Sequence, residues 1–412
     1  MSEPQRPRCF ITFVSGATVG GIETLAERLG EELLAGNDAV LICARTDEAR
    51  GQLNPAIDYL TVPNELAWTG RLVDHLRDRY RNHELVLVAL HPWTLVLFYS
   101  LRYRLRRAGW NTVRCFHLLT HSRGLFMQSG IINDVETRVF FAAPRRSNYF
   151  MNEAARLAHS GHWGMDLSDF PVLQLPMRPT DFCWKPRRGS ALRIVSVGRL
   201  VPFKGYNRAA PAIVRALRDE GVDATWDIWG DGQDHDLIRT TSDAVGVSEY
   251  VRLRGPLEYA SLQSELCRYD VFVGMGTAIL EAAQIRMPSI CAIEGTIEDG
   301  YGFLHEAPED SVGDVIAGAK QTLLIDTLRD YAGMDEARRM NVGEQCRTSA
   351  ERRSRTMQEF SDAVRNAEPW PARVDVRSLA LLAYVRSMLT ARALRNQLGS
   401  RVRRGSIAAP SR

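Results

Sequence analysis

The chain lacks paired cysteines, long apolar runs and a signal-like N-terminus. Its seven cysteines are scattered and include no C-x-x-C pair, so neither a disulfide framework nor a structural zinc site is expected. No stretch of about 18 apolar residues is present, which argues against a membrane-spanning helix. The first residues do not have the charged-then-apolar layout of a signal peptide, so we expect a cytoplasmic protein.

A strong charge of one sign is also absent. The 412 residues carry a formal net charge of +3, with 45% hydrophobic and 25% charged residues, which is an ordinary globular composition. The residues from Ala372 onward hold nine arginines and one aspartate, a balance of +8, so residues 1–371 carry −5. A mildly acidic body is not typical of a nucleic-acid-binding domain, and we expect no nucleic-acid partner. The length predicts two domains.

Short β-rich runs alternate with helical patterns along most of the chain. In the first half the expected strands are Cys9–Val14, Ala39–Ala44, Leu85–Leu90 and Thr112–Phe116, with helices over Gly21–Leu34 and Thr69–Tyr80. In the second half the expected strands are Leu192–Val197, Thr225–Trp229, Tyr250–Arg254, Val271–Val273 and Ser289–Ala292, with helices over Arg208–Glu220, His235–Val245, Tyr259–Cys267 and Ala278–Ile285. This alternation predicts parallel sheets with right-handed crossovers, and a proline-rich junction at 171–190 separates two doubly wound domains around a cleft.

The expected strand Leu192–Val197 ends in a loop that carries two cations. The segment 194–205 reads IVSVGRLVPFKG and places Arg199 and Lys204 just beyond the strand. Ligands of open α/β sheets bind beyond the carboxyl ends of the strands, and Arg and Lys suit phosphate oxygens. The loop is therefore either a pyrophosphate grip or a surface loop with two solvated cations.

Glycines follow other expected strands. Gly20 and Gly21 precede the first expected helix, where bare N–H groups suit an anion or a sugar hydroxyl; tight strand-to-helix packing is the alternative. Gly276 and Thr277 open a later helix, with Glu281 one turn further on. A carboxylate placed there can accept hydrogen bonds from both hydroxyls of a ribose.

Together, these motifs resemble those of a retaining GT-B glycosyltransferase of family 4. The motifs are GGIE at 20–23, VGRLVPFKG at 197–205, WGDG at 229–232, VRLRG at 251–255, GMGTAILEA at 274–282 and MPSI at 287–290. The resemblance spans about residues 10–365 and implies two Rossmann-like domains facing a central cleft. It also implies transfer of a sugar from a nucleotide diphosphate donor, without a metal or other cofactor, to a glycan or polyprenyl-linked acceptor.

The same resemblance implies roles for individual residues. Two cations would stabilise the leaving diphosphate, and a histidine that ends the strand Thr112–Phe116 would lie near the donor sugar: Arg199, Lys204 and His117. Further residues would bind the donor, with Glu281 at the ribose and Leu257 at the base: Gly20, Gly21, Gly276, Thr277, Glu281 and Leu257. Retention in this fold is described as front-face attack, in which the leaving diphosphate accepts the acceptor's proton.

One position departs from the family pattern. The family has a first glutamate eight positions before the one that matches Glu281, and Val273 stands there. We interpret this as altered sugar recognition. Two alternatives stay open, a catalytically inert nucleotide-sugar-binding partner of another transferase and a nucleotide-sugar epimerase.

Other histidines and acids have structural explanations. His91 and His121 lie near expected strand ends, where a histidine is more often a hydrogen-bonded structural residue than a catalytic one. Asp234 and Asp236 form a D-x-D sequence, which a different glycosyltransferase fold uses to hold manganese. At an expected helix start, however, acids cap free N–H groups and favour the helix dipole, so we expect no metal.

The tail Val376–Leu398 places apolar residues at helical spacing among arginines. Such a basic amphipathic helix can lie on an anionic membrane, pack back on the protein or bind a partner helix. The first alternative implies a peripheral location on the inner face of the cell membrane, and the family resemblance implies a role in cell-surface polysaccharide synthesis. The expected division is 1–175 for the acceptor domain, 190–368 for the nucleotide-sugar domain and 369–412 for the tail.

Overall fold

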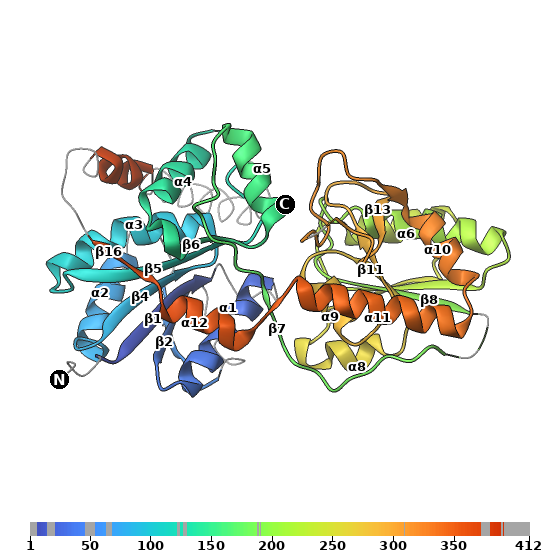
Figure 1. Cartoon of the computed structure of the whole chain (residues 1–412), viewed down its shortest axis with the longest axis horizontal. Coiled ribbons are helices and arrows are strands. Elements are labelled where there is room, and N and C mark those ends of the chain that lie inside the picture. Colours follow the sequence, from blue (N-terminus) through green and yellow to red (C-terminus); the bar gives the residue numbers. More distant parts are fainter. Residues whose placement is uncertain are drawn as a thin grey trace, which may run out of the picture. The chain divides into compact units, whose positions relative to one another are not determined.

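The structure is a computed structural model, and its described residues form two compact units. They are residues 6–14, 21–45, 54–62, 68–121, 124–126, 130–187, 189, 191–308, 310–371, 380–388 and 390. The first unit draws on Met1–Met151, His159–Leu173 and Met357–Arg412, and the second draws on Asn152–Ala158 and Gln174–Thr356. Each unit is a Rossmann-like α/β domain with helices on both faces of a twisted sheet (Figure 1).

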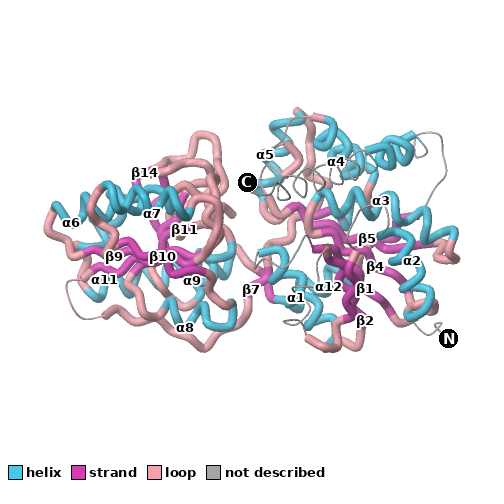
Figure 2. The backbone as a smooth tube through the Cα atoms, turned by 180° about the vertical axis from the view of Figure 1, so that it is seen from behind, coloured by secondary structure: helices cyan, strands magenta, loops and turns pink. Residues whose placement is uncertain are grey.

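The first unit contains, in its described residues, a seven-stranded sheet. The strands are β1 (Arg8–Val14), β2 (Ala39–Ala44), β3 (Asp58–Thr61), β4 (Glu84–Ala89), β5 (Thr112–Leu119), β6 (Asn148–Phe150) and β16 (Glu368–Pro371). The helices of this unit are α1 (Gly21–Ala35), α2 (Trp68–Arg79), α3 (Pro92–Arg107), α4 (Ile131–Ala142) and α12 (Met357–Arg365), while α5 (Glu153–Trp163) is divided between the two units. The strand order is β16-β5-β4-β1-β2-β3, with β6 also on β5, and every pair except β16–β5 is parallel. Helices α1 and α12 cover one face and α2 and α3 the other (Figures 1 and 2).

The second unit contains a second seven-stranded sheet within the described residues. Its strands are β8 (Leu192–Val197), β9 (Ala224–Trp229), β10 (Val251–Gly255), β11 (Val271–Gly274), β12 (Ser289–Ala292), β13 (Asp299–Phe303) and β14 (Thr322–Leu323). Its helices are α6 (Tyr206–Asp219), α7 (His235–Ala244), α8 (Leu262–Leu266), α9 (Thr277–Gln284), α10 (Leu324–Ala332) and α11 (Glu336–Arg352). The order is β10-β9-β8-β11-β12-β13-β14, antiparallel only at β12–β13 and β13–β14. A small separate sheet pairs β7 (Pro176–Met177) with β15 (Arg355–Thr356).

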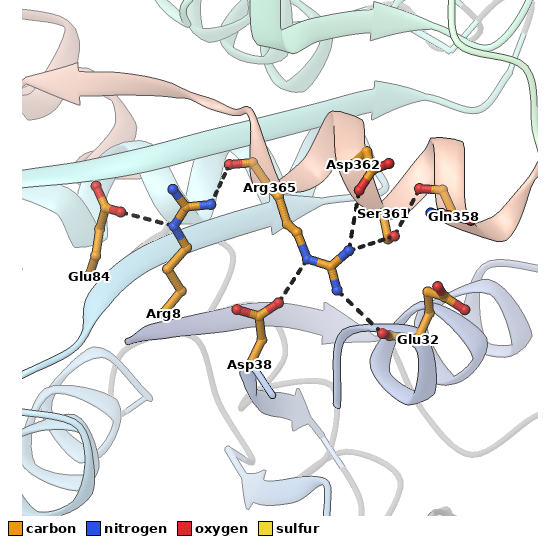
Figure 3. Close-up of polar contacts among 8 residues, drawn as sticks. All are labelled: Arg8, Glu32, Asp38, Glu84, Gln358, Ser361, Asp362 and Arg365. Carbon is orange, nitrogen blue, oxygen red and sulfur yellow. Dashed lines mark hydrogen bonds and ion pairs between the residues drawn. The ribbon is translucent and has the colours of Figure 1, made fainter. Parts of the chain in front are cut away.

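The segment after Thr356 belongs to the first unit, which corrects the expected domain boundary at residue 368. In α12, Arg365 Nε donates to Asp38 Oδ2 at 2.9 Å (Figure 3). Arg8 Nη1 donates to the backbone oxygen of Arg365 at 2.9 Å, and Arg8 Nε donates to Glu84 at 3.2 Å. The two contacts of Arg365 join residues more than 300 positions apart, so local sequence patterns could not reveal them.

Strand β16 is held at its end by Trp370. The indole is 3% exposed, and its Nε1 donates to the backbone oxygen of Ala142 at 3.1 Å. The guanidinium carbon of Arg102 lies 4.5 Å from the centroid of the Trp370 ring and 4.2 Å from that of Tyr99. Trp370 therefore combines burial of a large ring with a cation–π contact.

The described part of the tail, residues 380–388 and 390, is helical and lies beside α4 (Figures 1 and 2). Leu382 and Val385 are buried, and the Tyr384 hydroxyl donates to Asp134 Oδ2 at 3.2 Å. Of the three alternatives for the tail, these contacts support packing back on the protein. Among the described residues, no helix has both the length and the apolar character needed to span a membrane.

Candidate active site

The carboxyl ends of the parallel strands in the second unit meet at one edge of its sheet, and close backbone contacts join the loops that follow them. Gly198, after β8, donates its N–H to Trp229 O at 2.9 Å. Gly230, after β9, donates its N–H to Gly255 O at 2.7 Å. Gly230 has a φ of 138°, and a Cβ there would collide with the carbonyl oxygen of Gly198. Glycine is therefore required where these loops touch.

The loop 198–205 is also fixed on its other side. Gly295, in the loop after β12, donates its N–H to Phe203 O at 2.8 Å. A Cβ on Gly205 would collide with the carbonyl oxygen of Thr296. Because both neighbours hold its backbone, the loop presents its side chains from a preorganised frame.

Arg199 and Lys204 extend from this frame as two cations close in sequence. Arg199 is exposed and Lys204 is partly buried. Burial, and secondarily the charge of Arg199, lower the pKa of Lys204 to about 8. Neither side chain forms an ion pair with any carboxylate in the described part of the chain. A bound anion would relieve this unfavourable pairing of charges.

The N-terminus of α9 lies beyond the neighbouring strand β11. Gly276 is the N-cap with a φ of 71°, and no described atom lies within 4 Å of the position that a Cβ would take there. Thr277 is exposed, whereas Glu281 is 3% exposed. The N–H groups of a helix start, together with its dipole, favour a negatively charged ligand.

The carboxylate of Glu281 is hydrogen-bonded on both oxygens. The Tyr259 hydroxyl donates to Oε1, and Gln263 Nε2 donates to Oε2 at 3.1 Å. Tyr259 and Gln263 lie outside the sequence motifs that predict the donor site. Their spacing of four residues within an expected helix was the available signal, because such residues share one helix face.

Leu257 and Val273 are the positions that the family resemblance assigns to the base and to the sugar of the donor. Leu257 follows β10 and is half-buried. Val273 is fully buried in β11, where its backbone oxygen accepts a hydrogen bond from Ser196 Oγ at 2.9 Å. No polar side chain is therefore available at the position where the family pattern has a glutamate.

His117 lies in the first unit, at the end region of β5, and is fully buried. Asn148 Nδ2 donates to Phe140 O at 2.9 Å, so Asn148 Oδ1 faces the histidine and accepts from Nδ1 at 2.5 Å. Nε2 must then be the acceptor nitrogen, and it has no hydrogen-bond partner among the described residues. Burial lowers the pKa of His117 to about 4, so the ring is neutral near pH 7.

Three other candidate residues from the sequence lie in or near the first helices of the first unit or outside the described residues. Gly21 is the exposed first residue of α1, and Gly20 lies outside the described residues. His91 caps α3, where its Nδ1 accepts from Trp93 N at 3.1 Å.

The D-x-D acids make structural contacts, although not by the expected cap. Asp234 makes no side-chain cap bond to α7 and instead accepts two hydrogen bonds from Arg208, at 2.8 and 2.5 Å. No cluster of three or more His, Cys, Asp or Glu residues that could hold a metal ion occurs in the described ranges.

The strand-edge loops lie within a stretch that matches a known family. Residues 191–324 match the family described as glycosyl transferases group 1. This part of the chain is therefore similar to a glycosyl transferase group 1 domain. It contains Arg199, Lys204, Leu257, Gly276, Thr277 and Glu281. No curated protein matches the sequence significantly.

Solved structures resemble most of the chain, including parts outside residues 191–324. HepE from Anabaena, in complex with UDP, is 13% identical with a TM-score of 0.63, over 87% of this chain and 98% of its own. WaaG, a glycosyltransferase involved in lipopolysaccharide biosynthesis, is 13% identical with a TM-score of 0.60, over 87% of this chain and 100% of its own. Sucrose-phosphate synthase from Thermosynechococcus elongatus is 13% identical with a TM-score of 0.60, over 86% and 96%. These likenesses confirm the predicted GT-B fold.

Proposed function

We propose that the protein is a glycosyltransferase that moves a sugar from a nucleotide diphosphate donor to a glycan or lipid-linked acceptor. The observation that carries the proposal is the pair Arg199 and Lys204, two cations without a described acidic partner at the strand edge of a group 1 domain. A diphosphate supplies the anion that this pair lacks. Because HepE was solved with UDP, UDP-sugars are the first donors to test.

We assign the remaining donor contacts to residues at the same edge of the second sheet. The N–H groups at the start of α9 and the Thr277 hydroxyl face the phosphates and sugar, with Gly276 leaving room for close approach. Glu281 receives the ribose hydroxyls, and Leu257 packs against the base.

The proposed reaction retains the configuration at the sugar and uses no metal. The bond from the anomeric carbon to the diphosphate oxygen breaks, and a bond to the acceptor oxygen forms on the same face. The leaving diphosphate takes the acceptor's proton. Arg199 and Lys204 stabilise the charge that develops on the diphosphate, which is the main source of acceleration in such a mechanism.

The sugar end of the site differs from the family pattern. Val273 offers no hydrogen bond to the sugar, which supports altered donor-sugar recognition. His117 offers a neutral acceptor nitrogen, so the group that it recognises must donate a hydrogen bond, as a sugar hydroxyl does.

Turnover of a nucleotide sugar tests the assignment of the two cations. Release of nucleoside diphosphate should fall by about two to three orders of magnitude in Arg199→Ala and in Lys204→Met. Lys320→Met, which removes an exposed lysine of the same domain, should leave turnover unchanged. Full turnover by folded Arg199→Ala and Lys204→Met would remove both residues from the mechanism.

Val273 keeps two other functions open. A catalytically inert partner of another transferase would bind a nucleotide sugar without releasing nucleoside diphosphate. An epimerase would change the sugar without any acceptor. The same turnover assay separates these outcomes from transfer when the products are analysed with and without acceptor.

A peripheral location on the inner face of the cell membrane, in cell-surface polysaccharide synthesis, is a further part of the proposal. Leu382 and Val385 are buried beside α4, so membrane binding through the tail requires the helix to leave that position. Sedimentation of the full chain with anionic liposomes, beside a chain ending at Pro371, tests this. Ending at Pro371 keeps Trp370, so the first domain retains its edge strand. Equal sedimentation of both proteins would show that the tail does not mediate membrane binding.

A further inference from the structure

The carboxylate of Glu281 is held by side chains that lie outside the motifs of the donor site. Tyr259 and Gln263 each donate to one of its oxygens, and Glu281 itself is 3% exposed. A carboxylate has about four acceptor positions, which is more than these two donors use. Both oxygens are thus fixed in direction.

A second row of contacts orients the two donors. Thr180 Oγ1 donates to Gln263 Oε1 at 2.5 Å, which turns the amide nitrogen toward the carboxylate. The backbone N–H of Phe182 donates to Thr180 Oγ1 at 3.0 Å, so the hydroxyl proton is directed at Gln263. The Arg178 guanidinium lies 5.6 Å from the centroid of the Tyr259 ring. The segment that precedes β8 therefore contacts both side chains that hold the carboxylate.

The same segment is itself held to the domain. Trp184 Nε1 donates to Tyr269 O at 2.7 Å, and the backbone N–H of Trp184 donates to Ile285 O at 2.7 Å. Trp184 is 3% exposed. Thr180 is consequently positioned by a backbone that is docked four residues further on, rather than by a loose linker.

We propose that Tyr259, Gln263 and Thr180 are positioning residues that set the carboxylate plane of Glu281 for recognition of the donor's ribose. The inference rests on the proposed function, which assigns the ribose to Glu281. Two hydroxyls on adjacent carbons can bind one carboxylate together only when its plane has a defined rotation. The terminal torsion of a glutamate has a broad, roughly two-fold distribution, so packing alone sets it poorly. Hydrogen bonds from Tyr259 and Gln263 set it here.

This arrangement predicts discrimination between ribose and 2′-deoxyribose. A deoxynucleotide leaves one hydrogen bond to a buried carboxylate unmade. Sites built to bind a hydroxyl reject analogues that lack it, and we expect a preference of roughly tenfold or more. The preference depends on the orientation of the carboxylate plane. Loss of a positioning residue should therefore reduce the preference for ribose while the protein stays folded.

The test measures dissociation constants of UDP and 2′-deoxy-UDP by calorimetry, with the GDP and ADP pairs in parallel. The wild type is compared with Thr180→Val, Gln263→Leu and Tyr259→Phe. We expect the ribose preference to fall at least about threefold in each variant, with the donor KM rising more than kcat falls. Thr180→Ser, which keeps the hydroxyl, should restore the wild-type ratio.

Two matched controls remove the same groups elsewhere in the domain. Thr240→Val changes an exposed threonine of α7, and Tyr250→Phe changes a tyrosine that packs under Arg218. Both should retain the ribose preference.

The outcomes separate this inference from the proposed function. If the wild type prefers the ribonucleotide and all three variants keep that preference, the positioning role is wrong and the glycosyltransferase proposal stands. If the wild type binds ribo- and deoxynucleotides equally, Glu281 does not hold the ribose, and the inference fails together with that assignment but not with the proposed sugar transfer. If the wild type binds none of the diphosphates, the proposed function fails and the inference with it.

Discussion

Donor binding should weaken steeply above pH 8, because Lys204 loses its proton there. Burial, followed by the charge of Arg199, lowers the pKa of Lys204 to about 8. A bound diphosphate stabilises the ammonium and raises this pKa again. Binding therefore takes up a proton above pH 8, and the affinity falls by about tenfold per pH unit until the bound-state pKa is reached. Below pH 8 the lysine is already charged and the affinity is flat.

The size of the effect can be isolated with Lys204→Met, which keeps an unbranched chain and removes the charge. Loss of a hydrogen bond to a charged group costs about 1.5–3 kcal/mol, which corresponds to roughly 10- to 150-fold weaker binding. This loss should be seen below pH 8, and it should shrink as the pH rises because the wild-type lysine is neutral there. Lys320→Met is the matched control, since Lys320 is exposed in the same domain.

Titration calorimetry with UDP between about pH 7 and 9.5 measures both quantities. Phosphate groups have a second pKa near 6, so the ligand stays fully ionised across this range and does not contribute its own slope. A slope above pH 8 that persists in Lys204→Met would refute the assignment, because another group would then carry the proton. A flat wild-type profile would refute it as well.

Three further predictions concern stability. Trp370→Ala should lower the free energy of unfolding of the first domain by about 3–5 kcal/mol, measured by denaturant titration, because it empties a buried site; a loss below about 1 kcal/mol would contradict the role of β16. Between pH 6.5 and 4 the histidine His117 binds a proton in the unfolded state but stays neutral in the folded state, where it is buried. Acidification over this range should therefore lower the free energy of unfolding by up to about 3 kcal/mol. His117→Gln should flatten that part of the stability profile, and an unchanged profile would show that His117 is not the group. Gly230→Ala should lower the melting temperature more than Gly221→Ala, since both have positive φ but only the first would collide with backbone; equal losses would mean that the contact with Gly198 is unimportant.

The second sheet could be predicted well from the sequence because its signals are local. The strand Leu192–Val197 was predicted with the bounds that β8 has, and α9 and α7 begin within one residue of the expected positions. Each apolar run is short, and glycines mark where each ends. Parallel strands bring their carboxyl ends to one edge of a sheet. For this reason the sequence predicts one shared site for Arg199, Lys204, Gly276 and Glu281.

Contacts between distant segments could not be predicted in this way. Strand β16 pairs with β5 across more than 250 residues, and its four residues contain two prolines, which argue against a strand. Helix α3 was missed for a different reason. Residues 92–103 are all buried, so the helix has no long polar face and shows no helical period.

The candidate site shows the same limit. The role of Glu281 was accessible from its spacing after Gly276, whereas the contact of Gln263 with Thr180 depends on how the segment before β8 docks. The neutral state of His117 depends on burial, and its tautomer depends on Asn148, which lies 31 residues away. The spacing of residues in the sequence predicts which helix or strand carries each group. The hydrogen bonds of these groups depend on tertiary packing, which the spacing does not reveal.

The central claim is that this protein transfers sugars from nucleotide diphosphate donors, and the fate of the donor tests it most directly. UDP-, GDP- and ADP-sugars are incubated with the full chain and a glycan or lipid-linked acceptor and followed by phosphorus NMR, in the presence of a metal chelator. The account predicts that at least one donor yields nucleoside diphosphate, and that the rate falls about a hundredfold or more in Lys204→Met. Donor binding without release of nucleoside diphosphate from any sugar would contradict it.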